Sequence, residues 1–191
     1  YCQADVIIRE AIKITIGDAG NFIALAQTAA EAGNHQEAYD YYNKALEAEP
    51  NNCQAWQGKG ISAGWQSSLT KSRMNEMLVC IKKSIAITEN ESLKEVLRMQ
   101  SAVEVVQVAQ AYFDLSTEHT MQFISVPEAK YEHFDRCREI VNVCEEAKLL
   151  DTNLPEANRL IIDISKRLLG VSGISSNDQK FFADALSRNG G

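Results

Sequence analysis

Apolar and small residues recur every three or four positions from Phe22 to Pro50, which predicts two amphipathic helices. Gly33-Asn34 lies between them and favours the left-handed conformation that ends a helix. Pro50 cannot continue the second helix. The segment is therefore expected to fold as a helical hairpin. The two apolar stripes consist of Phe22, Leu25, Ala26 and Ala29, and of Ala38, Tyr41, Tyr42, Ala45 and Leu46.

A second copy of this pattern follows in altered form. Its register agrees with the first copy only after an insertion at Ser67–Arg73, a polar segment typical of a loop. The loop should lengthen a connection without disturbing the packing. The matching positions are Trp56, Gly60 and Ala63 for Phe22, Ala26 and Ala29, followed by Met77, Ile81 and Ser84 for Ala38, Tyr42 and Ala45.

A third copy is larger. Leu93–Phe113 contains no Gly or Pro and predicts one long helix, whereas Leu115–Val126 is expected to be a loop. The apolar pattern returns at Tyr131–Leu150, and Pro155–Leu169 is expected to be the last packing helix. Within Tyr131–Leu150, the positions that correspond to Ala38, Tyr42, Ala45 and Ala48 are Ile140, Cys144, Ala147 and Leu150.

The residues of the first hairpin resemble the tetratricopeptide repeat (TPR) family. The resemblance implies an all-α fold: an α-solenoid of about three antiparallel hairpins in a right-handed superhelix, closed by a C-terminal capping helix. Ala26 and Ala29 replace the Gly and Tyr most common in the family. The residues that match the family pattern, in order, are Phe22, Leu25, Ala26, Ala29, Gly33, Ala38, Tyr42, Ala45 and Pro50.

The expected organisation has three parts. Residues 1–20 form an N-terminal segment, and residues 21–169 form the repeat domain. Residues 170–191 form a linker and a short helix over Asp178–Arg188, in which Phe181 and Phe182 dock on the domain or, alternatively, face a partner. The repeat domain divides into units at 21–52, 53–90 and 91–151 and a capping helix at 155–169.

The N-terminal segment alternates apolar and other residues between Val6 and Ile16, which predicts extended chain. Tyr1-Cys2-Gln3-Ala4 resembles the end of a zinc ribbon, a module that precedes TPR arrays in some bacterial proteins. The alternative is an isolated cysteine. One cysteine cannot supply the four ligands of a structural zinc site, so no metal is expected there.

The resemblance also implies a function, because the first helix of each TPR unit lines a concave groove. We expect a protein–protein interaction scaffold that binds a peptide or partner protein there. For Trp65, burial under the Ser67–Arg73 loop is an equal alternative. The family's clamp for a chaperone carboxyl terminus is absent, because Ile23, Gln27, Gln57 and Ile61 replace its basic and Asn residues. The predicted partner-binding residues are Ile23, Gln27, Glu31, Gln57, Ile61 and Trp65.

Two other functions stay open. The chain could be a structural or self-associating module that forms a homodimer, or a regulatory domain of a larger multidomain protein. The net charge of −7 disfavours nucleic acid as a partner. No apolar run approaches the ~18 residues of a membrane span. The five cysteines are odd in number and lie mostly on helical faces, which favours reduced thiols and a cytoplasmic location.

Candidate chemistry does not change this interpretation. The sequence lacks GxSxG, HExxH and a Gly-rich phosphate loop, so no enzyme activity and no cofactor are expected. His133 and Cys137 can share one helical face, but Cys144 lies about two turns further, roughly 10 Å away. That distance is too long for a shared metal, so we expect Cys144 to be a core thiol.

Overall fold

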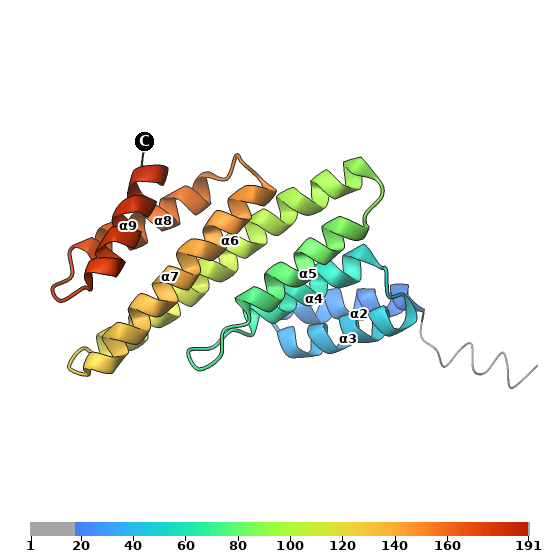
Figure 1. Ribbon diagram of the computed structural model, residues 1–191. Helices are drawn as coiled ribbons and strands as arrows, with labels where there is room; N and C mark the ends of the chain where they lie inside the picture. Colours follow the sequence, from blue (N-terminus) through green and yellow to red (C-terminus); the bar gives the residue numbers. More distant parts are fainter. Residues whose placement is uncertain (1–17, 191) are drawn as a thin grey trace, which may run out of the picture.

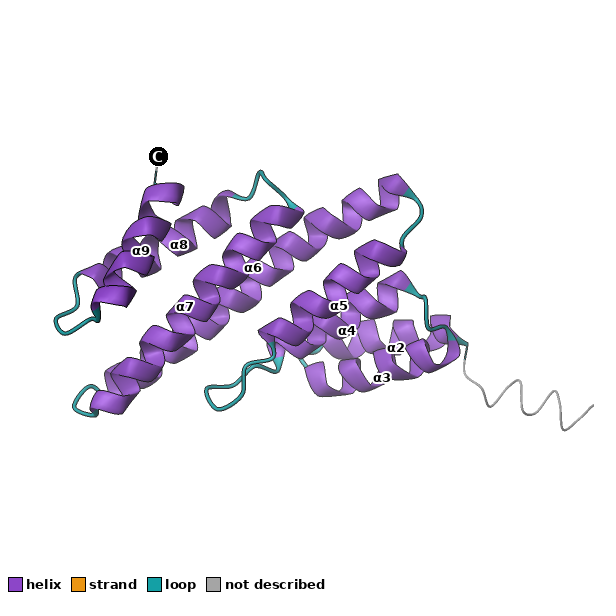
Figure 2. Ribbon diagram, viewed as in Figure 1, coloured by secondary structure: helices purple, strands orange, loops and turns teal. Residues whose placement is uncertain are grey.

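The computed structural model describes residues 18–190, which form eight helices and no β-strand (Figures 1 and 2). The predictions made for Cys2 and for most of the N-terminal segment lie outside the described residues. Four hairpins, α2/α3, α4/α5, α6/α7 and α8/α9, follow one another along the chain (Figure 1). The helices are α2 (Ala19–Glu31), α3 (His35–Ala48), α4 (Cys53–Trp65), α5 (Met74–Ile87), α6 (Glu91–Gln122), α7 (Pro127–Leu150), α8 (Pro155–Leu169) and α9 (Ser176–Asn189).

Local sequence chemistry sets several helix ends. Gly33 has a φ of 76°, which favours glycine, and it separates α2 from α3. Asn34 and Asn52 cap α3 and α4, because each side-chain oxygen accepts a hydrogen bond from a main-chain N–H of the first turn. Pro127 and Pro155 lie in the first turns of α7 and α8, where a missing N–H removes no helical hydrogen bond. The predicted bounds of α8 are confirmed.

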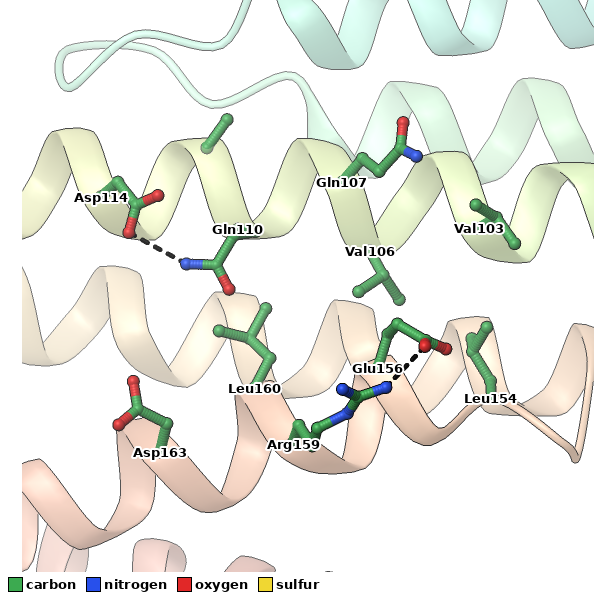
Figure 3. Close-up of a pocket in the computed structure, with 11 residues that line it drawn as sticks. Val103, Val106, Gln107, Gln110, Asp114, Leu154, Glu156, Arg159, Leu160 and Asp163 are labelled. Atoms are coloured by element: carbon green, nitrogen blue, oxygen red, sulfur yellow. Dashed lines mark hydrogen bonds and ion pairs between the residues drawn. The ribbon is translucent and has the colours of Figure 1, made fainter.

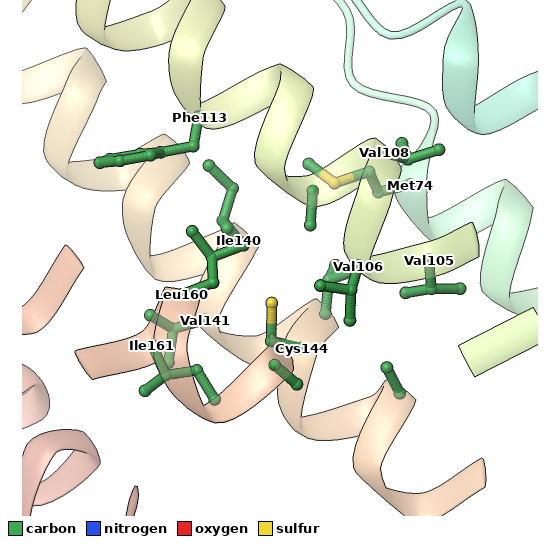
Figure 4. Packing of buried hydrophobic residues seen from close by; sticks show 14 of the residues in the cluster. Met74, Val105, Val106, Val108, Phe113, Ile140, Val141, Cys144, Leu160 and Ile161 are labelled. Carbon is green, nitrogen blue, oxygen red and sulfur yellow. The ribbon is translucent and has the colours of Figure 1, made fainter. Parts of the chain in front are cut away.

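The core follows the spacing of apolar and small residues. A small cluster joins α2, α3 and α4. A larger cluster extends from α5 to α9, and Figure 4 shows part of it. Although Ala48 is exposed and Leu150 is half-buried, the other corresponding positions of α3, α5 and α7 are buried, which confirms their assignment to the core. These positions are Ala38, Tyr42 and Ala45 in α3, Met77, Ile81 and Ser84 in α5, and Ile140, Cys144 and Ala147 in α7.

The predicted loop at Leu115–Val126 is wrong, because α6 continues to Gln122. Two of its polar residues, Ser116 and Thr120, make hydrogen bonds that are compatible with the helix. Ser116 Oγ lies 2.8 Å from His133 Nδ1 of α7, and Thr120 Oγ1 donates to the Ser116 carbonyl at 2.8 Å. With these groups hydrogen-bonded, nothing forces the chain out of helical geometry.

The inserted Ser67–Arg73 segment is a loop, as expected. It makes hydrogen bonds to residues of the α6/α7 hairpin. Tyr112 Oη donates to the Ser68 carbonyl, and Arg136 Nη2 donates to the Leu69 carbonyl at 3.2 Å. Ser72 Oγ donates to Glu139 at 2.6 Å. The insertion therefore connects α5 to the next hairpin by hydrogen bonds.

The first helices of the four hairpins form a row: α2 contacts α4, α4 contacts α6, and α6 contacts α8. At the far end α9 packs on α8, with Phe182 fully buried and Phe181 half-buried. The expected docking of the tail helix on its own domain is confirmed. This row is the surface on which the predicted partner-binding residues must be sought.

Candidate functional site

The six predicted partner-binding residues differ widely in exposure. Ile23 of α2 is buried, with 7% of its surface accessible, whereas Gln27 and Glu31 on the same helix are exposed. Ile61 of α4 is half-buried. Ile23 therefore packs within the first hairpins and offers little surface to another molecule.

Gln57 of α4 is engaged inside the molecule. Its Nε2 donates to Ser101 Oγ at 2.9 Å and to the Leu97 carbonyl at 3.4 Å, both on α6. Ser101 is fully buried, so this amide satisfies a group that water cannot reach. The geometry gives Gln57 a structural role between α4 and α6.

Trp65 stacks on a histidine of the preceding hairpin. The rings of Trp65 and His35 lie 5.5 Å apart at an interplanar angle of 12°. The indole is half-buried against the larger core cluster. Burial lowers the pKa of His35, which favours the neutral ring in this stack. Trp65 thus keeps only part of its surface for a partner.

A groove with a volume of about 610 Å³ runs between α6 and α8. Both helices pack on α7, and the groove lies where they flank each other (Figure 3). Its walls are mainly apolar, and amides and charged groups lie among them. The lining residues are Val103, Val106, Gln107, Gln110, Ala111 and Asp114 of α6, Leu154 just before α8, and Glu156, Arg159, Leu160 and Asp163 of α8.

Ion pairs order the α8 wall of this groove. Glu156 accepts from Arg159 at 2.7 Å, and Asp163 pairs with Arg167 at 2.9 Å. On the α6 wall, Asp114 accepts a hydrogen bond from the neutral amide of Gln110 at 2.9 Å. Such exposed pairs contribute little to stability, but they fix the positions of the charges around the groove.

Sequence reasoning did not find this groove. Val103 lies within the predicted long helix Leu93–Phe113 at an apolar position, yet 45% of its surface is accessible. Two neighbours on that helix, Val96 and Met99, are 46% and 50% accessible. The signal that could have revealed an open face is the mixture of these apolar residues with Gln100, Gln107 and Gln110.

The residues considered as metal ligands are part of the buried interior: His133, Cys137 and Cys144. Cys137 Sγ lies 3.6 Å from His133 Nε2, and all three side chains are buried. Burial raises the pKa of both thiols to about 12, so they stay protonated at neutral pH and are poor nucleophiles and ligands. Within residues 18–190, no group of three His, Cys, Asp or Glu side chains could hold a metal ion.

The connection between α6 and α7 exposes several large apolar side chains. We call this set the apolar tip, and it lies at the end of the long hairpin (Figure 1). Met121 and Ile124 are 70% and 79% accessible, which is high for residues of this type. The apolar tip consists of Met121, Phe123, Ile124 and Val126.

No protein-family model matches this chain, and a search of curated proteins finds no significant match. Among the helices of residues 18–190, none combines the length and the apolar character that crossing a membrane requires.

Proposed function

We propose that this chain is a protein-interaction scaffold of the TPR type, which binds a peptide or partner protein along the row of first helices. The observation that carries the proposal is the groove between α6 and α8, with a volume of about 610 Å³ and mainly apolar walls. An open apolar groove with a few polar groups is the usual form of a recognition site.

The arrangement of the hairpins supports a TPR-like solenoid. Each hairpin packs on the next in chain order, and the first helices contact one another in a row. Gly60 of α4 lies where a side chain would meet the main chain of α5, which suits the small-residue position of the family pattern. A repeat array of this kind presents an extended surface, because each unit contacts only its neighbours.

In this proposal the partner's apolar side chains occupy the α6–α8 groove, and Gln27, Glu31 and the exposed parts of Ile61 and Trp65 extend the contact toward α2. Burial of apolar surface drives the association. Gln107 and Gln110 supply donors and acceptors that orient the bound chain. Gln57 and Ile23 pack inside the molecule below this surface and do not contact the partner.

The test compares wild-type protein with the variants Ala111→Arg and Val103→Asp as baits for proteins of the source organism. Both positions are exposed within the groove, so the changes should leave the helical content intact. Ala183→Arg, at an exposed position of α9, is the matched control. We expect a partner that is captured by wild type and by the control and lost from both groove variants. Identical capture by all four proteins would contradict the proposal.

Self-association is a second candidate function, favoured by the apolar tip. Two of its four side chains are more than two-thirds accessible, and large contiguous apolar surface usually marks an interface. The tip of one copy would then pack against another copy.

Light scattering over a concentration series tests this candidate. We expect wild type to shift toward a dimer as concentration rises, and Ile124→Asp to remain monomeric. Lys71→Asp, on the exposed part of the Ser67–Arg73 loop, is the control for added acidic charge. A wild-type protein that stays monomeric at all concentrations would exclude self-association through the tip.

A further inference from the structure

The two walls of the α6–α8 groove differ in charge. Residues 99–129, which include most of α6, contain four acidic side chains and no lysine or arginine. On the α8 wall, Glu156 and Asp163 are each paired with an arginine. The α8 wall is therefore close to neutral, whereas the α6 wall carries one carboxylate that lines the groove, Asp114. The four acidic residues of 99–129 are Glu104, Asp114, Glu118 and Glu128.

Asp114 is the acidic group of α6 that lines the groove. It is exposed, and its hydrogen-bond donor is the neutral amide of Gln110. Among residues 18–190, no lysine or arginine forms an ion pair with it. A carboxylate beside low-dielectric apolar walls attracts an incoming cation more strongly than a carboxylate on a flat, fully solvated surface does.

We propose that the occupant of the groove is an extended segment of a partner protein, with apolar side chains flanked by lysine or arginine. This inference rests on the proposed function and specifies the ligand of the same site. Arg159 and Arg167 pair with Glu156 and Asp163, so Asp114 is the carboxylate of the groove that an incoming cation can pair with. A basic flank adds attraction, and an acidic flank adds repulsion.

The dimensions and the amides favour an extended segment. Val103 and Asp114 are eleven residues apart on α6, which corresponds to roughly 16 Å along the helix. That length accommodates about five residues of extended chain. Gln107 and Gln110 line the α6 wall, and extended chain offers them main-chain groups that a helix would already have used (Figure 3).

The experiment uses three fluorescent peptides that share a central Leu-Ala-Leu and carry two flanking lysines, glutamines or glutamates on each side. Binding is measured by fluorescence anisotropy, and the bound site is mapped by amide chemical shifts. A fourth peptide replaces both leucines of the lysine peptide by serine. The protein variants are Asp114→Asn and, as the matched control, Asp184→Asn at an exposed position of α9.

We expect the lysine peptide to bind at least tenfold more tightly than the glutamate peptide, with shifts confined to α6 and α8. Asp114→Asn should weaken binding of the lysine peptide about threefold, and Asp184→Asn should not. Added salt should reduce the difference in affinity between the lysine and glutamate peptides.

Two results would overturn the inference and leave the proposed function standing. One is equal binding of all three peptides in the groove, and the other is tight binding of the serine peptide, which indicates general attraction to an acidic protein. Binding of none of the peptides would also overturn the inference, and the capture experiment with Ala111→Arg would then decide the proposed function separately.

Discussion

A methyl group added at Gly60 would lie 2.9 Å from the main-chain oxygen of Met77, closer than a Cβ atom tolerates. Helices α4 and α5 approach each other at this point because glycine has no side chain. The main chain of α5 cannot move aside as a flexible side chain could.

Gly60→Ala should therefore destabilise the protein. Overpacking costs about 1–3 kcal/mol, partly offset by about 0.5–1 kcal/mol from replacing a helical glycine, so we expect a net loss of about 1–2 kcal/mol. Urea denaturation followed by circular dichroism measures this change. Gly20→Ala is the control, since its added methyl would meet Asp18 at an ordinary 3.6 Å. Equal stability of the two variants would contradict the close approach.

Gln57 should contribute to stability rather than to binding. Gln57→Ala leaves Ser101 Oγ buried without its donor, which costs about 1–3 kcal/mol. Gln54→Ala, at an exposed position of the same helix, should stay within about 0.5 kcal/mol of wild type. Chemical denaturation of both variants, with the double variant Gln57→Ala/Ser101→Ala, gives the coupling energy. A coupling near zero would show that the hydrogen bond between α4 and α6 contributes nothing.

Phe182 should anchor the tail helix. Its side chain is fully buried against the larger core, so Phe182→Ala should cost about 3–5 kcal/mol if α9 stays folded, and should otherwise release α9. Hydrogen exchange distinguishes the two cases, and we expect faster exchange in α9 with α2–α5 unchanged. Lys180→Ala, at an exposed position, is the control. Unchanged protection of α9 at wild-type stability would contradict the docking.

Acid should destabilise the protein through His133. Burial and, as a smaller cause, the positive charge of Arg136 together lower the pKa of His133 from 6.5 to about 4. Between these two values the unfolded chain binds a proton that the folded chain does not, so stability falls as pH falls. The difference corresponds to about 3 kcal/mol.

The free energy of unfolding measured between pH 7 and pH 4 tests this dependence. We expect the slope to flatten in His133→Asn, which removes the imidazole. Gln122→Ala, at an exposed position of the same hairpin that does not titrate, should keep the wild-type slope. A slope that is the same in all three proteins would assign the acid sensitivity to other groups.

Much of the fold could be predicted from periodicity, because helices bury stripes at fixed spacing. The bounds of α8 and the core positions of α3, α5 and α7 follow from that rule. The end of α6 did not, since Ser116 resembles a loop residue until His133 of α7 is placed beside it. A partner that is remote in sequence supplied the missing hydrogen bond.

The candidate site was harder to predict for the same reason. A stripe of apolar residues does not reveal which of its members a neighbour covers. Val106 is buried beside α8, while Val103, three residues earlier, is left open because α8 approaches α6 at few points. Gln57 is the opposite case. It was expected at the partner-binding surface, but its amide donates a hydrogen bond to Ser101 of the adjacent helix α6.

Site-specific photo-crosslinking tests the central claim most directly. A photoreactive amino acid at Gln107, in the α6–α8 groove, is compared with the same amino acid at Gln179, at an exposed position of α9. We predict a crosslinked partner from position 107, lost when Ala111→Arg is added, and none from position 179. Crosslinking of the partner at position 179 with none at position 107 would contradict the assignment of the groove.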